Sequence, residues 1–260
     1  MNILALKLML APLILGGASL AGRRWGPTVS GWLIGLPLTS GPVIFFVAIS
    51  HSETFAASTV LGTLSGGLPL VAFCLSYAWA AKRFGWPVSI TTSLLCYAGI
   101  TVVMQNLILP LEIIFPLVVL VILLGLWLMP KNSQLEAVNS TPGKWDLPAR
   151  IVLGTSFILL ITGIAPLIGP RLTGLLSTIP LYTAILTIFS HRLQGPAGAA
   201  SVLRGLLYGL FGFAGFYLVL ALLLGHNSLG LAFGAAILIT LVIQGVSLLV
   251  LRRAHKQTPA

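Results

Sequence analysis

Charged residues are scarce in this chain. Only 7% of its 260 residues are charged, and four of them are Asp or Glu, whereas a soluble globular domain carries about 25% charged residues. Hydrophobic residues make up 57% of the sequence. This composition excludes a soluble domain and predicts an all-α polytopic membrane protein, because helices satisfy their own backbone hydrogen bonds in lipid.

Motifs of enzyme chemistry are missing as well. The sequence has no His-Glu-x-x-His, no nucleophile elbow and no P-loop, and its acidic residues form no carboxylate pair on one helix face. We therefore expect no enzyme activity, no cofactor and no nucleotide-driven transport by this chain. Cys74 and Cys96 lie inside apolar segments without metal-ligand spacing, so we interpret them as core residues and expect no metal.

Basic residues, in contrast, give the chain a net charge of +10. They form short clusters at the ends of apolar segments, which is the pattern of the positive-inside rule. We therefore expect the chain's partner to be the lipid bilayer and not nucleic acid.

Proline, glycine and charge interruptions divide the apolar sequence into about nine transmembrane helices. One span takes about 20 residues, so the run 87–129 is about twice too long and must turn back near Gln105 and Asn106. Arg23 and Arg24 follow the first apolar stretch, which favours a retained helix over a cleaved signal peptide. The predicted spans are 3–21, 29–50, 55–81, 87–106, 109–129, 149–166, 170–190, 197–224 and 228–251.

The basic clusters fall in every second connection between these spans, so they share one side of the membrane. The connections on the other side hold few charged residues beyond Glu53, Glu112 and Arg171. We therefore predict an outside N-terminus and a cytoplasmic C-terminus. The cytoplasmic connections and tail hold Arg23, Arg24, Lys82, Arg83, Lys131, Lys144, Arg150, Arg192, Arg252, Arg253 and Lys256.

The two halves of the chain resemble each other at an offset of 143 residues. Segment 26–66 aligns with 169–209 without a gap, and 13 of 41 positions are identical, against roughly a tenth expected by chance. The equivalent second and seventh helices would cross the membrane in opposite directions. We predict two inverted four-helix repeats joined by a linking helix, with a parallel repeat and one miscounted helix as the alternative. The predicted units are a first repeat over 1–106, a linking helix and cytoplasmic loop over 107–148, and a second repeat over 149–260.

Each half interrupts one of its helices with proline. The stretch GWLIGLPLTSGP, 31–42, contains Pro37 and Pro42, each of which lacks an N–H and clashes with the carbonyl four residues earlier. The second copy, GLLSTIPLYTAI, 174–185, keeps Pro180. Paired interrupted helices in two halves are typical of a transporter's midplane site, and close helix packing is the alternative. The candidate substrate-binding residues here are Pro37, Thr39, Ser40, Pro180, Tyr182 and Thr183.

Three further residues are candidates. Ser58 and Ser201 belong to a recurring Ala-Ala-Ser-x3-Gly-x3-Gly pattern, whose glycine spacing favours close helix packing over a site role. Arg204 falls about two turns into the eighth span, where a charge either lines a cavity or snorkels to the interface. Arg171 either steers anions or anchors a helix end. His51 and His191 are out of register by three residues, which argues against a symmetric proton relay.

The stretch 29–80, VSGWLIGLPLTSGPVIFFVAISHSETFAASTVLGTLSGGLPLVAFCLSYAWA, resembles the GlpM family of small bacterial inner-membrane proteins. IGLPL at 34–38 and STIPL at 177–181 carry the resemblance. It implies a bacterial inner-membrane location and an association with alginate-type exopolysaccharide production. This chain departs from the family pattern because it holds two such units.

The leading hypothesis is a secondary transporter or facilitator for a small polar solute, and Arg204 with the basic cytoplasmic face favours an anionic one. One alternative is a non-transporting accessory or scaffold protein in envelope polysaccharide or lipid metabolism, assembled as a homodimer or in a larger biosynthetic complex. The other alternative is a lipid-phosphate flippase.

Overall fold

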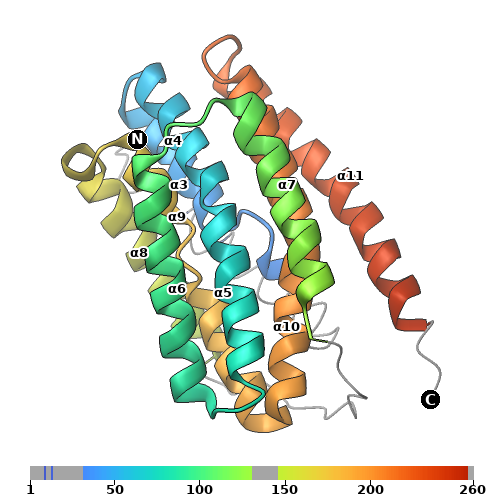
Figure 1. The fold of residues 1–260 in the computed structure, drawn as a ribbon. Coiled ribbons are helices and arrows are strands. Elements are labelled where there is room, and N and C mark those ends of the chain that lie inside the picture. The colour runs from blue at the N-terminus through green and yellow to red at the C-terminus, as the bar shows by residue number, and fades with distance from the viewer. Residues whose placement is uncertain (1–8, 10–12, 14–31, 131–145, 257–260) are drawn as a thin grey trace.

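The computed structural model describes Met9, Leu13 and residues 32–130 and 146–256. This part of the chain is nearly all helical and forms no sheet (Figure 1). Its helices are α3 (Ser40–Ser50), α4 (Glu53–Ser65), α5 (Gly67–Ala80), α6 (Trp86–Asn106), α7 (Leu111–Leu128), α8 (Asp146–Ile168), α9 (Pro170–Ser177), α10 (Leu181–Leu223) and α11 (Leu229–Lys256).

Six helical stretches of the described chain are long and apolar enough to cross a membrane. One of them, Glu53–Ala80, joins α4 to α5, and another, Pro170–Leu223, joins α9 to α10. Large apolar side chains are exposed along the outer helices, as expected for surfaces that face lipid rather than water. They include Leu95 and Val102 on α6, Leu120 and Trp127 on α7, and Leu238 and Leu241 on α11. These features indicate an all-α, membrane-embedded protein.

Helix α10 consists of two helices that meet at Gly195. Gly195 has φ 71° and ψ −168°, a backbone conformation that glycine adopts without a steric penalty. A straight helix of 43 residues would be about 65 Å long, roughly twice the hydrocarbon core. Figure 1 shows α10 descending to one end of the molecule and rising again. Residues 181–194 and 196–223 therefore run in opposite directions, as the separate predicted spans require.

Several basic side chains gather at one end of the molecule. The turn after α5 holds Lys82 and Arg83, both exposed, and Arg192 lies 6.0 Å from the ring centroid of Trp86 at the start of α6. Gly195 and the α5–α6 turn thus lie at the same end, at the bottom of Figure 1. We call this the basic end.

Helix boundaries recur at the offset of 143 residues. The stretch Glu53–Ala80 corresponds to 196–223 in α10, and the start of α6 at Trp86 corresponds to the start of α11 at Leu229. In Figure 1, α4 and α5 run toward the basic end, whereas 196–223 runs away from it. The match of helix boundaries at this offset therefore reaches beyond 26–66 and 169–209, as far as the starts of α6 and α11.

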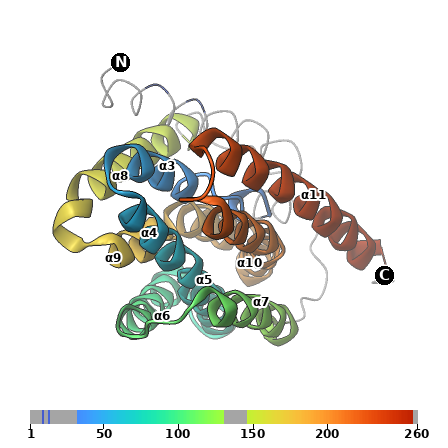
Figure 2. The same ribbon diagram turned by 90° about the horizontal axis from the view of Figure 1, so that it is seen from above.

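The equivalent helices Glu53–Ala80 and 196–223 form the centre of the bundle. They are the most buried long helices, and they contribute Tyr77, Phe73 and Tyr217 to the core. Figure 2 shows α6 and α7 covering one side of this centre, α11 another side, and α8 and α9 a third.

The fold corrects one detail of the sequence predictions. Pro42 does not break a helix, because α3 begins at Ser40 and Pro42 lies in its first turn, where a missing N–H costs no helical hydrogen bond. The turn predicted near Gln105 is confirmed, since α6 ends at Asn106. The predicted first span, apart from Met9 and Leu13, and loop residues 131–145 lie outside the described residues.

Candidate functional site

The first break lies between a helical turn at 32–34 and α3. Pro37 has no N–H, so the chain leaves the α-helical pattern and closes short turns instead. The Leu38 N–H donates to the Leu36 carbonyl at 2.7 Å, and the Gly41 N–H donates to the Pro37 carbonyl at 2.8 Å. These bonds satisfy part of the backbone that the break frees from helix.

The second break lies between α9, which ends at Ser177, and α10, which begins at Leu181. The Leu181 N–H donates to the Ile179 carbonyl at 2.8 Å, and the Ala184 N–H donates to the Pro180 carbonyl at 2.8 Å. Both bonds match those of the first break at the 143-residue offset. Two more bonds match in the same way: Gly35 to Trp32 with Thr178 to Leu175, and Leu36 to Leu33 with Ile179 to Leu176. The two breaks therefore have the same backbone hydrogen-bond pattern.

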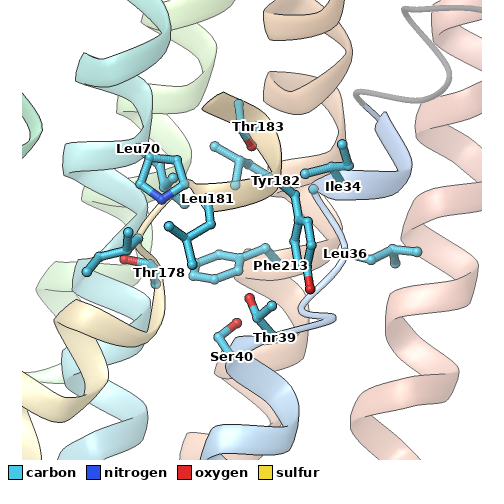
Figure 3. A pocket seen from close by; sticks show the side chains of 14 residues that line it. Ile34, Leu36, Thr39, Ser40, Leu70, Thr178, Leu181, Tyr182, Thr183 and Phe213 are labelled. Atoms are coloured by element: carbon cyan, nitrogen blue, oxygen red, sulfur yellow. The ribbon is translucent and has the colours of Figure 1, made fainter. Parts of the chain in front are cut away.

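The two breaks face each other across one small cavity (Figure 3). Its volume is about 40 Å³, which is room for a few water molecules. Figure 3 shows Tyr182 extending toward Thr39 and Ser40 on the opposite break. The lining residues are Ile34, Gly35, Leu36, Thr39, Ser40, Leu70, Thr178, Ile179, Pro180, Leu181, Tyr182, Thr183, Leu210 and Phe213.

The cavity has a mostly apolar lining that carries hydroxyl groups but no charge. Hydroxyl groups of both breaks line it, and within the described chain no lining residue is ionised at neutral pH. Helices α3 and α10 both begin at the cavity, at Ser40 and Leu181. The Gly41 and Ala184 N–H groups in these first turns already donate to the Pro37 and Pro180 carbonyls, but the two helix dipoles still place partial positive charge at the cavity. The arrangement can therefore bind a small polar group, and the two helix N-termini favour a negative one.

Close backbone contacts hold the breaks in place. A side chain at Gly35 would collide with the backbone of Gly209, and one at Gly66 would collide with Thr178. Gly35 and Thr178 are equivalent at the 143-residue offset, as are Gly66 and Gly209. The glycine-rich helix of each half thus packs on the broken segment of the other half. This confirms the packing role predicted for the Gly-x3-Gly pattern.

Outer helices anchor each break by hydrogen bonds. On α6, the Tyr97 hydroxyl donates to the Leu175 carbonyl at 3.1 Å and lies 2.9 Å from the Thr178 hydroxyl. On α11, the Ser247 hydroxyl accepts from the Trp32 indole N–H at 2.8 Å. Gln244, one turn before Ser247, donates to the Gly209 carbonyl at 3.0 Å. Tyr97, Gln244 and Ser247 were not predicted from the sequence, although Gln244 and Ser247 share one face of an apolar helix.

Five of the nine predicted site residues line the cavity: Thr39, Ser40, Pro180, Tyr182 and Thr183. The other four do not. Pro37 lies in the first break but outside the lining, and Ser58 is exposed on α4. The Ser201 hydroxyl donates to the Ala197 carbonyl of its own helix at 3.0 Å. Pro37, Ser58 and Ser201 therefore do not contact the cavity.

The two arginines near the membrane interior bind backbone carbonyls. Arg204 donates to the Pro130 carbonyl, beyond the end of α7, at 2.8 Å. Arg171 donates to the Met104 carbonyl of α6 at 2.7 Å. Neither lines the cavity, so each arginine instead ties its helix to a neighbouring segment of the chain.

The two histidines have different surroundings. His191 is buried, and its Nδ1 lies 3.2 Å from the Tyr77 hydroxyl. His51 stacks on Phe55 with ring centroids 4.6 Å apart. The difference agrees with the register argument against a symmetric relay.

Comparisons of the chain with protein-family models, with curated proteins and with solved structures find no match.

The contact between Gly35 and Gly209 predicts a steric effect on stability. Gly209→Ala should lower the melting temperature of the detergent-purified protein, because the new methyl group meets the Trp32 carbonyl and Gly35, and overpacking costs about 1–3 kcal/mol. Gly245→Ala is the matched control, since a methyl group there meets no other atom within 4 Å. Equal melting temperatures for the two variants would contradict the close approach.

The Tyr97 hydroxyl predicts a hydrogen-bond effect. Tyr97→Phe removes the group that holds Leu175 and Thr178, and a buried hydrogen bond contributes about 0.5–1.5 kcal/mol. We expect a lower melting temperature in the same assay. Thr92→Val on the same helix should change it less, because the half-buried Thr92 makes only an exposed hydrogen bond to the Val88 carbonyl of its own helix. A Tyr97→Phe variant as stable as the parent would rule out this anchor.

Proposed function

We propose that the chain is a secondary transporter or facilitator of a bacterial inner membrane, with a small polar solute bound between its two broken helices. The observation that carries this proposal is that the break of each half lines the same cavity. Interrupted helices in equivalent positions of two halves are the arrangement from which transporters build a midplane site.

The proposed topology is nine spans, with two inverted four-helix repeats joined by α7. The opposite directions of Glu53–Ala80 and 196–223 support it, as does the matched hydrogen bonding of the two breaks. The N-terminus would lie outside and the C-terminus in the cytoplasm, with the basic end inside. Two inverted halves can exchange conformations, and this exchange would open the shared site to each side in turn.

The solute is proposed to be small, polar and partly anionic. The hydroxyl groups of both breaks would supply the recognition, with the dipoles of α3 and α10 favouring negative charge, since Arg204 and Arg171 bind carbonyls elsewhere. A cavity of about 40 Å³ is smaller than a ligand site of about 300 Å³ or more. Transport would therefore require the two breaks to separate from this closed arrangement.

The scaffold and flippase alternatives stay predictions from the sequence, as does the resemblance to the GlpM family. The cavity does not favour a lipid phosphate, because none of its lining residues is basic. A homodimer or a larger envelope-biosynthesis complex is compatible with transport and with the scaffold role.

Transport can be measured with purified protein in proteoliposomes. Radiolabelled phosphate, sulfate, small carboxylates, amino acids and sugars would be compared with empty liposomes. We expect uptake of at least one solute, and a loss of about tenfold with Thr39→Val or Thr183→Val, as for a lost hydrogen bond to a charged group. Ser58→Ala is the control, because Ser58 is exposed on α4 and should leave uptake unchanged.

Two results would contradict the proposal. One is the absence of uptake for the whole panel by a protein that elutes as a single folded species. The other is uptake that Thr39→Val and Thr183→Val reduce no more than Ser58→Ala does.

A further inference from the structure

A buried polar stripe runs from the cavity along residues 181–194 of α10. Thr183, Thr187, Ser190 and His191 follow one another at helical spacing, so they share one face, and all four are buried. Thr183 lines the cavity, and His191 is four residues from the turn at Gly195. The stripe therefore connects the cavity with the basic end.

The equivalent face of the first half is apolar. At the 143-residue offset, the stripe corresponds to Ser40, Ile44, Val47 and Ala48 on α3. Ile44 and Val47 are buried hydrophobic residues of the core. The two breaks thus share a backbone hydrogen-bond pattern. Of the two helices that follow them, only residues 181–194 of α10, which lead to the basic end, carry a polar face.

The Thr187 hydroxyl group is buried on this stripe without a partner. Several buried threonines of the bundle bond the carbonyl four residues earlier in their own helix, as Thr63 and Thr101 do. The Thr187 Oγ1 atom, like that of Thr155, has no hydrogen-bond partner among the described residues. Buried polar groups are almost always paired with protein or water. The missing partner indicates a position that water or a passing solute occupies when the stripe opens.

A contact between the two halves closes the stripe at the basic end. The Tyr77 hydroxyl, on α5, lies 3.2 Å from His191 Nδ1. Both residues are buried, and Tyr77 is three residues before the end of α5. This hydrogen bond joins the first half to the second half directly beside Ser190.

We propose that solute and water reach the cavity from the basic end along Thr187 and Ser190, and that the Tyr77–His191 contact closes this route. The inference rests on the proposed transport function and adds to it the route of access and the gate. On the opposite side, the apolar face of α3 supplies no matching polar path.

Cysteine labelling in membrane vesicles tests the route. Single cysteines at Thr187 and Ser190 would be made in a Cys74→Ala, Cys96→Ala background and treated with a membrane-impermeant methanethiosulfonate from each side. The matched controls are Ile44→Cys and Val47→Cys. Arg192→Cys and Glu53→Cys, both at exposed positions, identify which membrane side is the basic end and which is the other. Each variant is first shown to elute as a single species.

We expect Thr187→Cys and Ser190→Cys to react from the side that labels Arg192→Cys, and the α3 controls to remain unlabelled. Tyr77→Phe should raise the labelling rate of Thr187→Cys about fivefold, the factor that matches one hydrogen bond of typical net strength. Absence of any rate increase would overturn the gate.

Thr183→Cys separates failure of the route from failure of the proposed function. Labelling of Thr183→Cys only from the Glu53 side, with Thr187→Cys unlabelled, would overturn the route and leave a transport site accessible from the other face. No labelling of Thr183→Cys from either side would contradict the proposed function as well, because the cavity would never open to water.

Discussion

Close backbone packing between the halves is the constraint on which the rest of the structure depends. Gly209 leaves no space for a side chain against Gly35, and Gly66 leaves none against Thr178. Without strong hydrophobic driving force between helices in lipid, small residues that allow such close approach are a main source of association. Because the packing is reciprocal, it fixes both breaks at once and sets them face to face around one cavity.

The breaks persist in an apolar surrounding because their polar groups find partners. Short turns take up several N–H groups at Pro37 and Pro180, and Tyr97 and Ser247 hold the segments that precede each break. Unpaired backbone groups would be costly in hydrocarbon. The hydroxyls of Thr39 and Thr183 and the starts of α3 and α10 then place polar groups in the otherwise mostly apolar lining of the cavity.

Several features were predictable from the sequence because they depend on backbone chemistry. Pro37 and Pro180 cannot continue a helix, and the glycines at 62, 66, 205 and 209 have the spacing of a packing face. The offset of 143 residues places these features at equivalent positions. Five of the predicted site residues line the cavity for this reason.

Other features depend on contacts between distant parts of the chain. A serine or tyrosine in an apolar helix looks the same in sequence whether it bonds its own helix, as Ser201 does, or another one, as Tyr97 does. The partner of Arg204 is a carbonyl 74 residues away, at Pro130. Pro42 was misread because its effect depends on where α3 begins, and helix ends are the least predictable part of a helix.

The central claim is that two equivalent halves cross the membrane in opposite directions. Its most direct test uses single cysteines at the equivalent and exposed positions Glu53 and Pro196, in a background without Cys74 and Cys96, labelled by an impermeant thiol reagent from each side of the membrane. The account predicts that the two positions react from opposite sides. Reaction of both from the same side would contradict the inverted arrangement and with it the main support for a transport site between the two breaks.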